Sequence, residues 1–247
     1  MKRIAHLTLA LALLAFGSCS IYHPQTVDIP LINHAGDTRV DAAVGVSAFL
    51  MLPDVVTVGG TVSHGFNDWI AGQVHLNYGG ENVYAQAAPG AYLPLGAHSV
   101  LEGYVGLGAG AAWRKPTWSS SDTAAAYATH YGYNGRFLLP FVQANIGWHD
   151  LTAAHIDLAL GLKTGAYCPD FLYRRYDPDG TPLPDHDVHY NTPNLLFEPQ
   201  LQFRIGSERV KYCFRVSVSV MSDMDNESGD HFTTDLLTIS NGLTFSF

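Results

Sequence analysis

Charged side chains are scarce in this sequence. Asp, Glu, Lys and Arg make up 14% of its 247 residues, against about a quarter in an average soluble domain. Only 13 residues are Lys or Arg, whereas 22 are Asp or Glu. Contact with nucleic-acid phosphates needs a basic face, so the balance argues against nucleic acid as a partner.

Long apolar runs are also missing after residue 20. No stretch there approaches the roughly 18 apolar residues that a membrane-spanning helix needs. Glycine is abundant, with 24 residues, and Phe, Trp and Tyr together reach 12%. Low charge, many glycines and aromatics and no spanning helix are typical of a β-barrel in lipid.

Cysteine is rare, with three residues in the chain. Cys19 belongs to the N-terminal segment discussed next, which leaves Cys168 and Cys213. We expect these two at opposite ends of different strands, so a disulfide between them is not expected. The sequence predicts no cofactor and no metal centre.

The first residues have the pattern of a targeting segment. Lys2 and Arg3 precede the apolar stretch 7–16, and Phe16-Gly17-Ser18-Cys19 resembles a bacterial lipobox. We expect residues 1–18 to be a signal peptide and Cys19 to be lipidated at the mature N-terminus. An ordinary secretory signal with an incidental Cys19 is the alternative. Cleavage leaves 11 basic and 22 acidic residues, a net charge of −11.

Residues 19–37 show little periodicity and carry Pro24, Pro30 and Gly36. We interpret them as a lipid-anchored extended tether. From residue 38 to 247, apolar and polar residues alternate with period two, the pattern of β-strands. The predicted fold is all-β, an up-and-down antiparallel transmembrane barrel of about ten strands, with eight to twelve possible. The strands are expected at 40–51, 55–64, 69–78, 82–93, 98–113, 135–148, 152–165, 194–206, 209–221 and 234–247.

Connections alternate in length in the later half of the chain. Tight turns are expected at 149–151 and 207–208, and long loops at 114–134, 165–193 and 222–233. Tight turns on one side and long loops on the other are the outer-membrane pattern. An even strand count also places both termini at the tight-turn side.

Alternation fits a soluble barrel as well, with its apolar face inside. Four features favour lipid outside instead: a polar face dominated by small uncharged residues, aromatic rims, a terminal strand that ends at Phe247, and closure without free edges. The expected aromatic rims are Tyr78, Trp113 and Tyr133 at one end, and Trp69, Trp148, Tyr212 and Phe247 at the other.

Residues 38–247 resemble the small outer-membrane β-barrel proteins of Gram-negative bacteria. The lipobox-like signal, the tether with Tyr22, Pro24 and Pro30-Leu31, and the terminal Phe247 look most like barrels of Bacteroidota. The resemblance implies location in the outer membrane and contact with its lipids and lipopolysaccharide. It also implies that the barrel assembly machinery reads the C-terminal strand ending at Phe247.

Several charged residues share the polar face and are expected inside the barrel. Charges in a lumen normally pair, because an unpaired one would be costly to desolvate. We expect a structural ion-pair network in a closed lumen; a narrow pore lined by both signs is the alternative. The network residues are Glu102, Asp157, Lys163, Glu198, Arg204, Lys211 and Arg215.

Two loops carry groups that could bind cations. Loop 165–193 contains Asp177, Asp179, Asp185, His186, Asp187 and His189 but lacks recognised ligand spacing, so we expect a solvated loop. Loop 222–233 is acidic without EF-hand spacing. Weak cation binding is the alternative to a plain hydrophilic loop there. Its acidic residues are Asp223, Asp225, Glu227 and Asp230.

Catalysis would need a Ser/His or Asp/His pair at a rim. Many histidines are present, but no Ser or Asp stands near one at a spacing that marks a family. We expect His75 and His155 to be hydrogen-bonding groups within strands. The leading hypothesis is a non-enzymatic outer-membrane barrel with specificity in its extracellular loops and an unknown surface ligand; a narrow channel and a rim hydrolase are the alternatives. Tyrosines could form the contact surface: Tyr131, Tyr133, Tyr167, Tyr173, Tyr176 and Tyr190.

Overall fold

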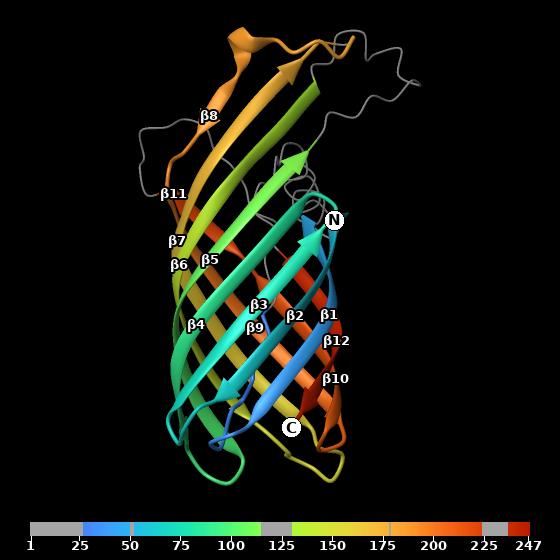
Figure 1. Cartoon of the computed structure of the whole chain (residues 1–247). Coiled ribbons are helices and arrows are strands. Elements are labelled where there is room, and N and C mark those ends of the chain that lie inside the picture. The colour runs from blue at the N-terminus through green and yellow to red at the C-terminus, as the bar shows by residue number, and fades with distance from the viewer. Residues whose placement is uncertain (1–26, 50–51, 115–129, 178, 224–236) are drawn as a thin grey trace, which may run out of the picture.

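The computed structural model describes residues 27–49, 52–114, 130–177, 179–223 and 237–247. In this part of the chain, ten antiparallel strands form a closed barrel, which confirms the predicted fold class (Figure 1). The barrel strands are β1 (Thr38–Phe49), β2 (Leu52–Gly65), β3 (Ile70–Gly79), β4 (Asn82–Pro94), β5 (Ser99–Arg114), β6 (His130–Trp148), β7 (Asp157–Tyr176), β9 (Asn194–Gly206), β10 (Val210–Val218) and β12 (Leu237–Ser246).

Each of the ten barrel strands pairs with the next one along the chain, and the pairing of the last with the first closes the circle. β12 pairs with β1, where Phe247 N donates to Thr38 O at 2.9 Å, and β7 pairs with β9. Two short strands, β8 (Val188–Tyr190) and β11 (Val220–Asp223), lie outside the ten-membered ring. Closure satisfies the backbone groups that a sheet edge would expose, as a lipid environment requires.

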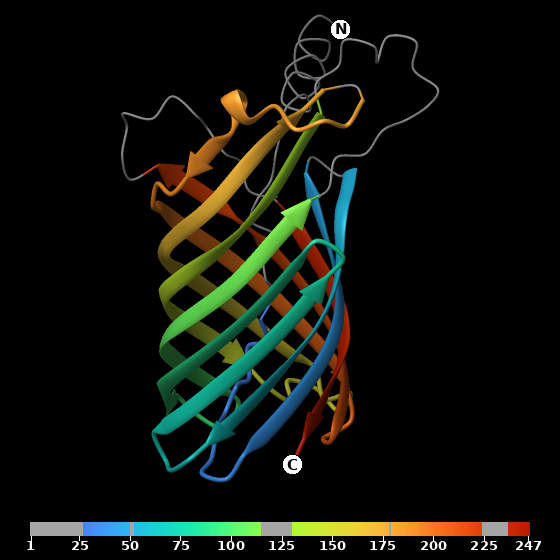
Figure 2. The same ribbon diagram turned by 45° about the horizontal axis from the view of Figure 1, so that its top comes forward.

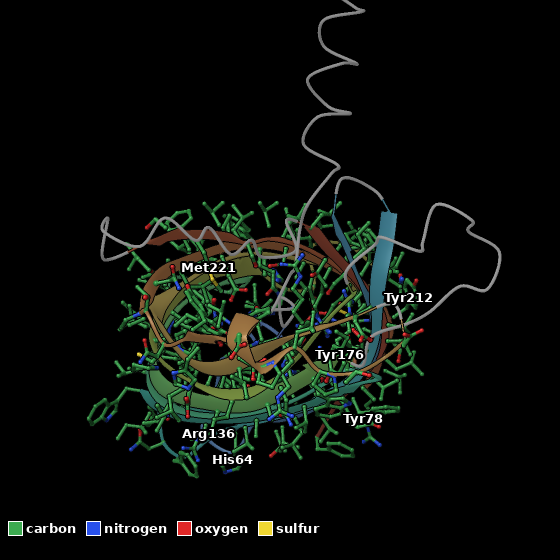
Figure 3. The ribbon with its side chains drawn as sticks, turned by 90° about the horizontal axis from the view of Figure 1, so that it is seen from above. His64, Tyr78, Arg136, Tyr176, Tyr212 and Met221 are labelled. Atoms are coloured by element: carbon green, nitrogen blue, oxygen red, sulfur yellow. The ribbon has the colours of Figure 1, made fainter. Side chains whose placement is uncertain are left out.

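Side chains alternate between the lumen and the outside along every long strand. On β9, Glu198, Gln202 and Arg204 are buried, whereas Leu195 and Leu201 are exposed. Seen along the barrel axis, side chains fill the interior, and Tyr78 and Tyr212 lie outside the wall (Figure 3). The exterior is therefore apolar and the lumen polar, the arrangement of a barrel surrounded by lipid.

The apolar exterior has a measurable height on β6 and β7. Outward positions are uncharged from Leu138 to Trp148 on β6 and from Leu158 to Cys168 on β7. Each stretch spans 11 residues, which matches the 9–11 residues of a tilted strand that crosses a bilayer. Immediately beyond it, outward-facing Arg136 pairs with Asp170 at 3.1 Å. The charge pair marks where the apolar band ends.

Beyond this band, β6 and β7 continue upward with β8 as a projection that we call the crest, residues 130–137 and 169–190 (Figure 1). The prediction of a loop at 165–193 is therefore wrong for residues 165–176, which continue β7. Pro169 concealed this continuation in the sequence. It lies where pairing with β9 has ended at Tyr167 and pairing with β8 has not yet begun at Phe171, a gap in which a missing N–H is tolerated.

Tight turns join the strands at the opposite end, where the C-terminus also lies (Figure 1). We call this the tight-turn end. Residues 152–156, predicted as strand, belong to the turn between β6 and β7. Asp150 and His155 have φ of 51° and 48° there, left-handed conformations that break a strand. His155 is thus a turn residue and not, as predicted, a strand residue.

The segment before β1 lies inside the barrel. It ascends the lumen from the tight-turn end (Figure 2). The side chains of Val27, Asp28, Ile29, Leu31 and Ile32 are fully or almost fully buried. We call residues 27–32 the plug. The predicted tether 19–37 thus includes six residues within the lumen; residues 1–26, with the predicted signal peptide and Cys19, lie outside the described residues. No helix in the described part of the chain is long and apolar enough to cross a membrane.

Candidate functional site

The plug is held through its backbone by side chains of β9. Gln202 Nε2 donates to Ile29 O at 2.8 Å, and Gln202 Oε1 accepts from Ile29 N at 3.0 Å. Two residues along both segments, Gln200 Nε2 donates to Val27 O at 2.7 Å. These side-chain amides replace the hydrogen bonds that a neighbouring strand would provide, so the backbone is satisfied in a buried position.

Asp28 anchors the plug electrostatically. Its Oδ1 atom accepts from Arg204 Nη2 at 2.6 Å and from Arg215 Nη2 at 3.0 Å, and all three side chains are buried. Arg215 also pairs with Asp41 of β1. Thr244 Oγ1 donates to the same Asp41 carboxylate at 3.1 Å. Each buried charge in this cluster thus faces an opposite charge, as burial requires.

A second cluster lies nearer the tight-turn end. Asp157 Oδ1 accepts from Lys211 Nζ at 2.6 Å, and Asp157 Oδ2 lies 3.6 Å from Arg204 Nη1. Glu102 contacts the plug, because its Oε1 accepts from Ile32 N at 2.8 Å, and its Oε2 accepts from Asn145 Nδ2 at 3.1 Å. The lower lumen is therefore crosslinked by side chains of β5, β6, β7, β9 and β10 and by the plug.

A third contact lies above the plug. Lys163 Nζ of β7 lies 2.6 Å from Glu198 Oε2 of β9. Glu198 Oε1 accepts from Ser219 Oγ at 2.6 Å. The structure thus places every residue of the predicted network in the lumen: Glu102, Asp157, Lys163, Glu198, Arg204, Lys211 and Arg215 are all buried there.

Three charged lumenal residues were missed by the sequence analysis. Asp28 lies in the segment taken as a tether. Arg39 and Asp41 follow the alternation of β1, in which Val40 and Ala42 occupy the intervening positions. Parity along residues 38–42 could have found Arg39 and Asp41. No periodic signal marks Asp28, because the plug is not part of the sheet.

Two small cavities lie along the polar wall of the lumen in the described part of the chain, one of them beside the plug. One cavity beside Val27, Lys163 and Gln200 has a volume of about 10 Å³, and another beside Asp41 and His75 also has about 10 Å³. Such a volume holds one water molecule at most. The geometry thus favours a closed lumen over an open pore.

The upper lumen is filled by aromatic rings rather than charges. Tyr84 stacks on Phe137 with ring centroids 5.8 Å apart, and Phe137 contacts Tyr167 at 5.0 Å. Inward glycines of β5 provide the room: a Cβ on Gly108 would lie 2.2 Å from Tyr84 Oη, and one on Gly110 would lie 2.4 Å from Phe137 Cζ. The glycines of β5 are therefore what allows the aromatic rings to fit inside the lumen.

Several predicted tyrosine contacts face inward. Tyr133, Tyr167, Tyr173 and Tyr190 are buried, so the prediction that they form a surface is wrong. They sit on the lumenal parity of their strands. Tyr133 is for the same reason not part of an outer aromatic rim. Tyr176 lines an open groove of about 390 Å³ at the crest, together with Trp113, Arg114, Gly132, Tyr133, Asn134, Leu172 and Arg174. Nothing is described of the Tyr131 side chain.

The Asp/His residues of the predicted loop 165–193 are distributed over the crest. Asp177 closes a turn by accepting from Thr181 N at 2.7 Å. Asp187 pairs with Arg174 at 3.7 Å, and His189 Nε2 lies 3.0 Å from Asp170 Oδ1. Of the predicted weak cation site, Asp223 ends β11, whereas Asp225, Glu227 and Asp230 lie outside the described residues.

One group of described side chains has the composition of a metal site. Ligand atoms of Asp28, Asp41 and Cys213 lie within 4.8 Å of one another. Arg204 and Arg215 already neutralise these carboxylates, and two guanidinium groups would repel a cation. The residues therefore do not fit a metal ion. Cys168 and Cys213 are both free thiols.

Histidines and acids meet at the turn between β6 and β7. Asp150 Oδ1 accepts from Lys211 Nζ at 2.9 Å and lies 3.0 Å from His155 Nδ1. Partial burial raises the pKa of Asp150, but the hydrogen bonds from Lys211, His155 and His149 outweigh burial and hold this pKa well below its usual range. Burial lowers the pKa of His149. The arrangement stabilises a left-handed turn.

Comparison with known proteins gives a fold but no family. No protein family and no curated protein matches this sequence. Among solved structures, the outer membrane protease OmpT from Escherichia coli is similar over 90% of this chain and 99% of that one, with a TM-score of 0.51 and 9% identity. The fold is thus of the class found in Gram-negative outer-membrane β-barrels.

Two further solved structures extend the range of similar barrels. KdgM porin covers 85% of this chain and 99% of its own length at 10% identity, with a TM-score of 0.38. The translocator domain of autotransporter NalP from Neisseria meningitidis covers 100% of this chain and 96% of its own length at 11% identity, with a TM-score of 0.41. A shared fold does not by itself select an activity.

Proposed function

We propose that this protein is a non-enzymatic barrel of the bacterial outer membrane that presents its crest at the cell surface. The filled lumen is the observation that carries the proposal, because a barrel closed by its own plug offers no transport path and leaves the crest as its accessible feature. The crest projects beyond the apolar band and carries the outward-facing ion pairs Arg136–Asp170 and Arg174–Asp187, at the level of the lipid headgroups. Its surface ligand is not assigned.

The location and orientation are tested by tag accessibility on intact cells. An epitope inserted at Asp179, in the crest turn, should bind antibody without permeabilisation. The same epitope in the turn at Ser207 should bind only after permeabilisation. Labelling of both sites, or of Ser207 alone, would contradict this orientation. Cell fractionation into inner and outer membranes tests the location itself.

The barrel is tested by gel mobility of unheated and heated protein in detergent. Phe171 and Tyr190 are paired across β7 and β8, so residues 172–189 can be replaced by a short turn without separating the strands. We expect this variant to retain the mobility shift on heating. Loss of the shift would show that the crest is part of the folding core and not a peripheral projection.

Lipidation of Cys19 belongs to the same proposal. The lipobox-like Phe16-Gly17-Ser18-Cys19, with the tether that follows it, supports a lipoprotein of the kind found among Bacteroidota barrels. Metabolic labelling with a fatty acid should mark the wild type and not the Cys19→Ser variant. Equal labelling of the two would refute lipidation at Cys19.

A further inference from the structure

We propose that the wall of the lumen carries a receptor site for a small carboxylate anion, formed by Arg204 and Arg215, in which Asp28 of the plug is a built-in occupant. The inference rests on the described residues of the lumen. It does not depend on the crest or on a surface ligand of the crest. It goes beyond the proposed surface role, because it assigns a ligand class to the interior.

The two arginines converge on one oxygen atom. Arg204 Nη2 and Arg215 Nη2 lie 2.6 and 3.0 Å from Asp28 Oδ1, and they come from adjacent strands of the rigid wall. Gln202 Oε1 accepts from Arg215 Nε at 2.9 Å and so fixes the guanidinium plane. Two prearranged guanidinium groups that face one carboxylate form a strong anion site.

Asp28 is the member of this cluster that the wall does not supply. Arg204 and Arg215 belong to barrel strands, as does Asp41, which pairs with Arg215. Asp28 comes from the plug, which is not part of the sheet. Removal of its carboxylate leaves the two guanidinium groups with one acidic partner fewer, so the local charge at the arginine pair becomes more positive.

The wall binds the plug through its backbone, as a protein binds a peptide ligand. Hydrogen bonds from Gln200 and Gln202 reach its backbone at alternate residues, and Glu102 accepts from Ile32 N. The plug is not part of the sheet, so it is bound by side chains of the wall. A chain segment whose backbone is held by amide side chains and whose carboxylate meets two arginines is a ligand geometry that the wall recognises.

Chemical rescue tests the site. In Asp28→Ala, the carboxylate is removed, and we expect the unfolding temperature in detergent to fall by about 10 °C. Sodium formate should restore at least half of this loss, because its carboxylate fits between the two arginines. Formamide at equal concentration should not. Wild-type protein measured in both additives corrects for general solvent effects.

The matched control is Asp28→Asn, in which a neutral amide fills the same space. Formate should not stabilise this variant beyond its effect on the wild type. The proposal is overturned by an unaltered unfolding temperature in Asp28→Ala, by equal rescue with formamide, or by no rescue at all. If Asp28→Ala does not fold alone, refolding yield replaces unfolding temperature: yield restored by formate only supports the site, and any other result rejects it. The mobility test of the wild-type barrel is independent of these outcomes.

Discussion

At the scale of single residues, the lumen concentrates charges that are expensive to bury. Each is retained because a partner from another strand or from the plug lies within contact distance, as with Lys163 and Glu198 at 2.6 Å. Such pairs are weak contributors to stability in themselves, but a broken pair leaves a charge uncompensated. The lumenal network therefore specifies which strands and which plug position fit together.

A double-mutant cycle on Lys163 and Glu198 tests this view. Lys163→Met alone should lower the free energy of unfolding by about 3–5 kcal/mol, because Glu198 is left buried without its cation. The double variant Lys163→Met/Glu198→Met should recover most of the loss, since no charge remains. Denaturant unfolding in detergent provides the measurement. Additive losses would show that the two side chains do not interact.

The histidine turn predicts a dependence of stability on pH. The pKa values of His149 and Asp150 both lie below their ordinary values of 6.5 and 3.8, so the folded state binds fewer protons than the unfolded state. Stability should therefore decrease as the pH falls below 6.5, and decrease further below 3.8. Asp150, Arg39 and Asp157 are the charged groups that act on His149.

The variant His149→Gln isolates the loss of stability that we attribute to protonation of His149. Because glutamine does not titrate, the unfolding temperature of this variant should change little between about pH 7.5 and 5. The decrease at lower pH that comes from protonation of Asp150 should remain. An identical profile in variant and wild type would assign the step to another group.

At the scale of strands, alternation in the sequence locates the elements well and their ends less well. The barrel strands lie close to their predicted ranges, because burial of one face and exposure of the other impose period two over ten or more residues. The continuation of β7 beyond 165 was missed since Pro169 and the following polar outward residues, Asp170 and Arg174, look like a loop. Outward charge there marks the edge of the apolar band and not the end of the strand.

The glycines of β5 give a prediction at the same scale. Gly110→Ala would place a Cβ 2.4 Å from Phe137 Cζ, so the ring must move within a filled lumen, at a cost of about 1–3 kcal/mol. Gly103→Ala on the same strand has nothing within 4 Å and serves as the control. Thermal unfolding in detergent should separate the two; equal stability would mean that the upper lumen is loosely packed.

At the scale of the whole molecule, the sequence predicts a barrel with an internal ion-pair network but not what fills the lumen. Parity assigns Arg204 and Arg215 to the polar face. It says nothing of Asp28, because residues 27–32 contribute no strand and their neighbours are about 170 positions away, as in the contact of Ile29 with Gln202. A closed lumen follows only when these distant contacts are known.

Removal of the plug is predicted to change the whole barrel from closed to conducting. Without residues 27–32, Arg204 and Arg215 lose the carboxylate of Asp28, so ions that enter should be predominantly anions. In planar bilayers we expect few channel events from the wild type. The Δ27–32 variant should give steady conductance. In a KCl gradient, its reversal potential should have the sign expected for a channel that prefers anions. Substitution of Arg204 and Arg215 by Met in that variant should abolish the anion preference. Wild-type conductance equal to that of Δ27–32 would show that the plug does not close the lumen, and cation selectivity would contradict the attraction of anions by Arg204 and Arg215.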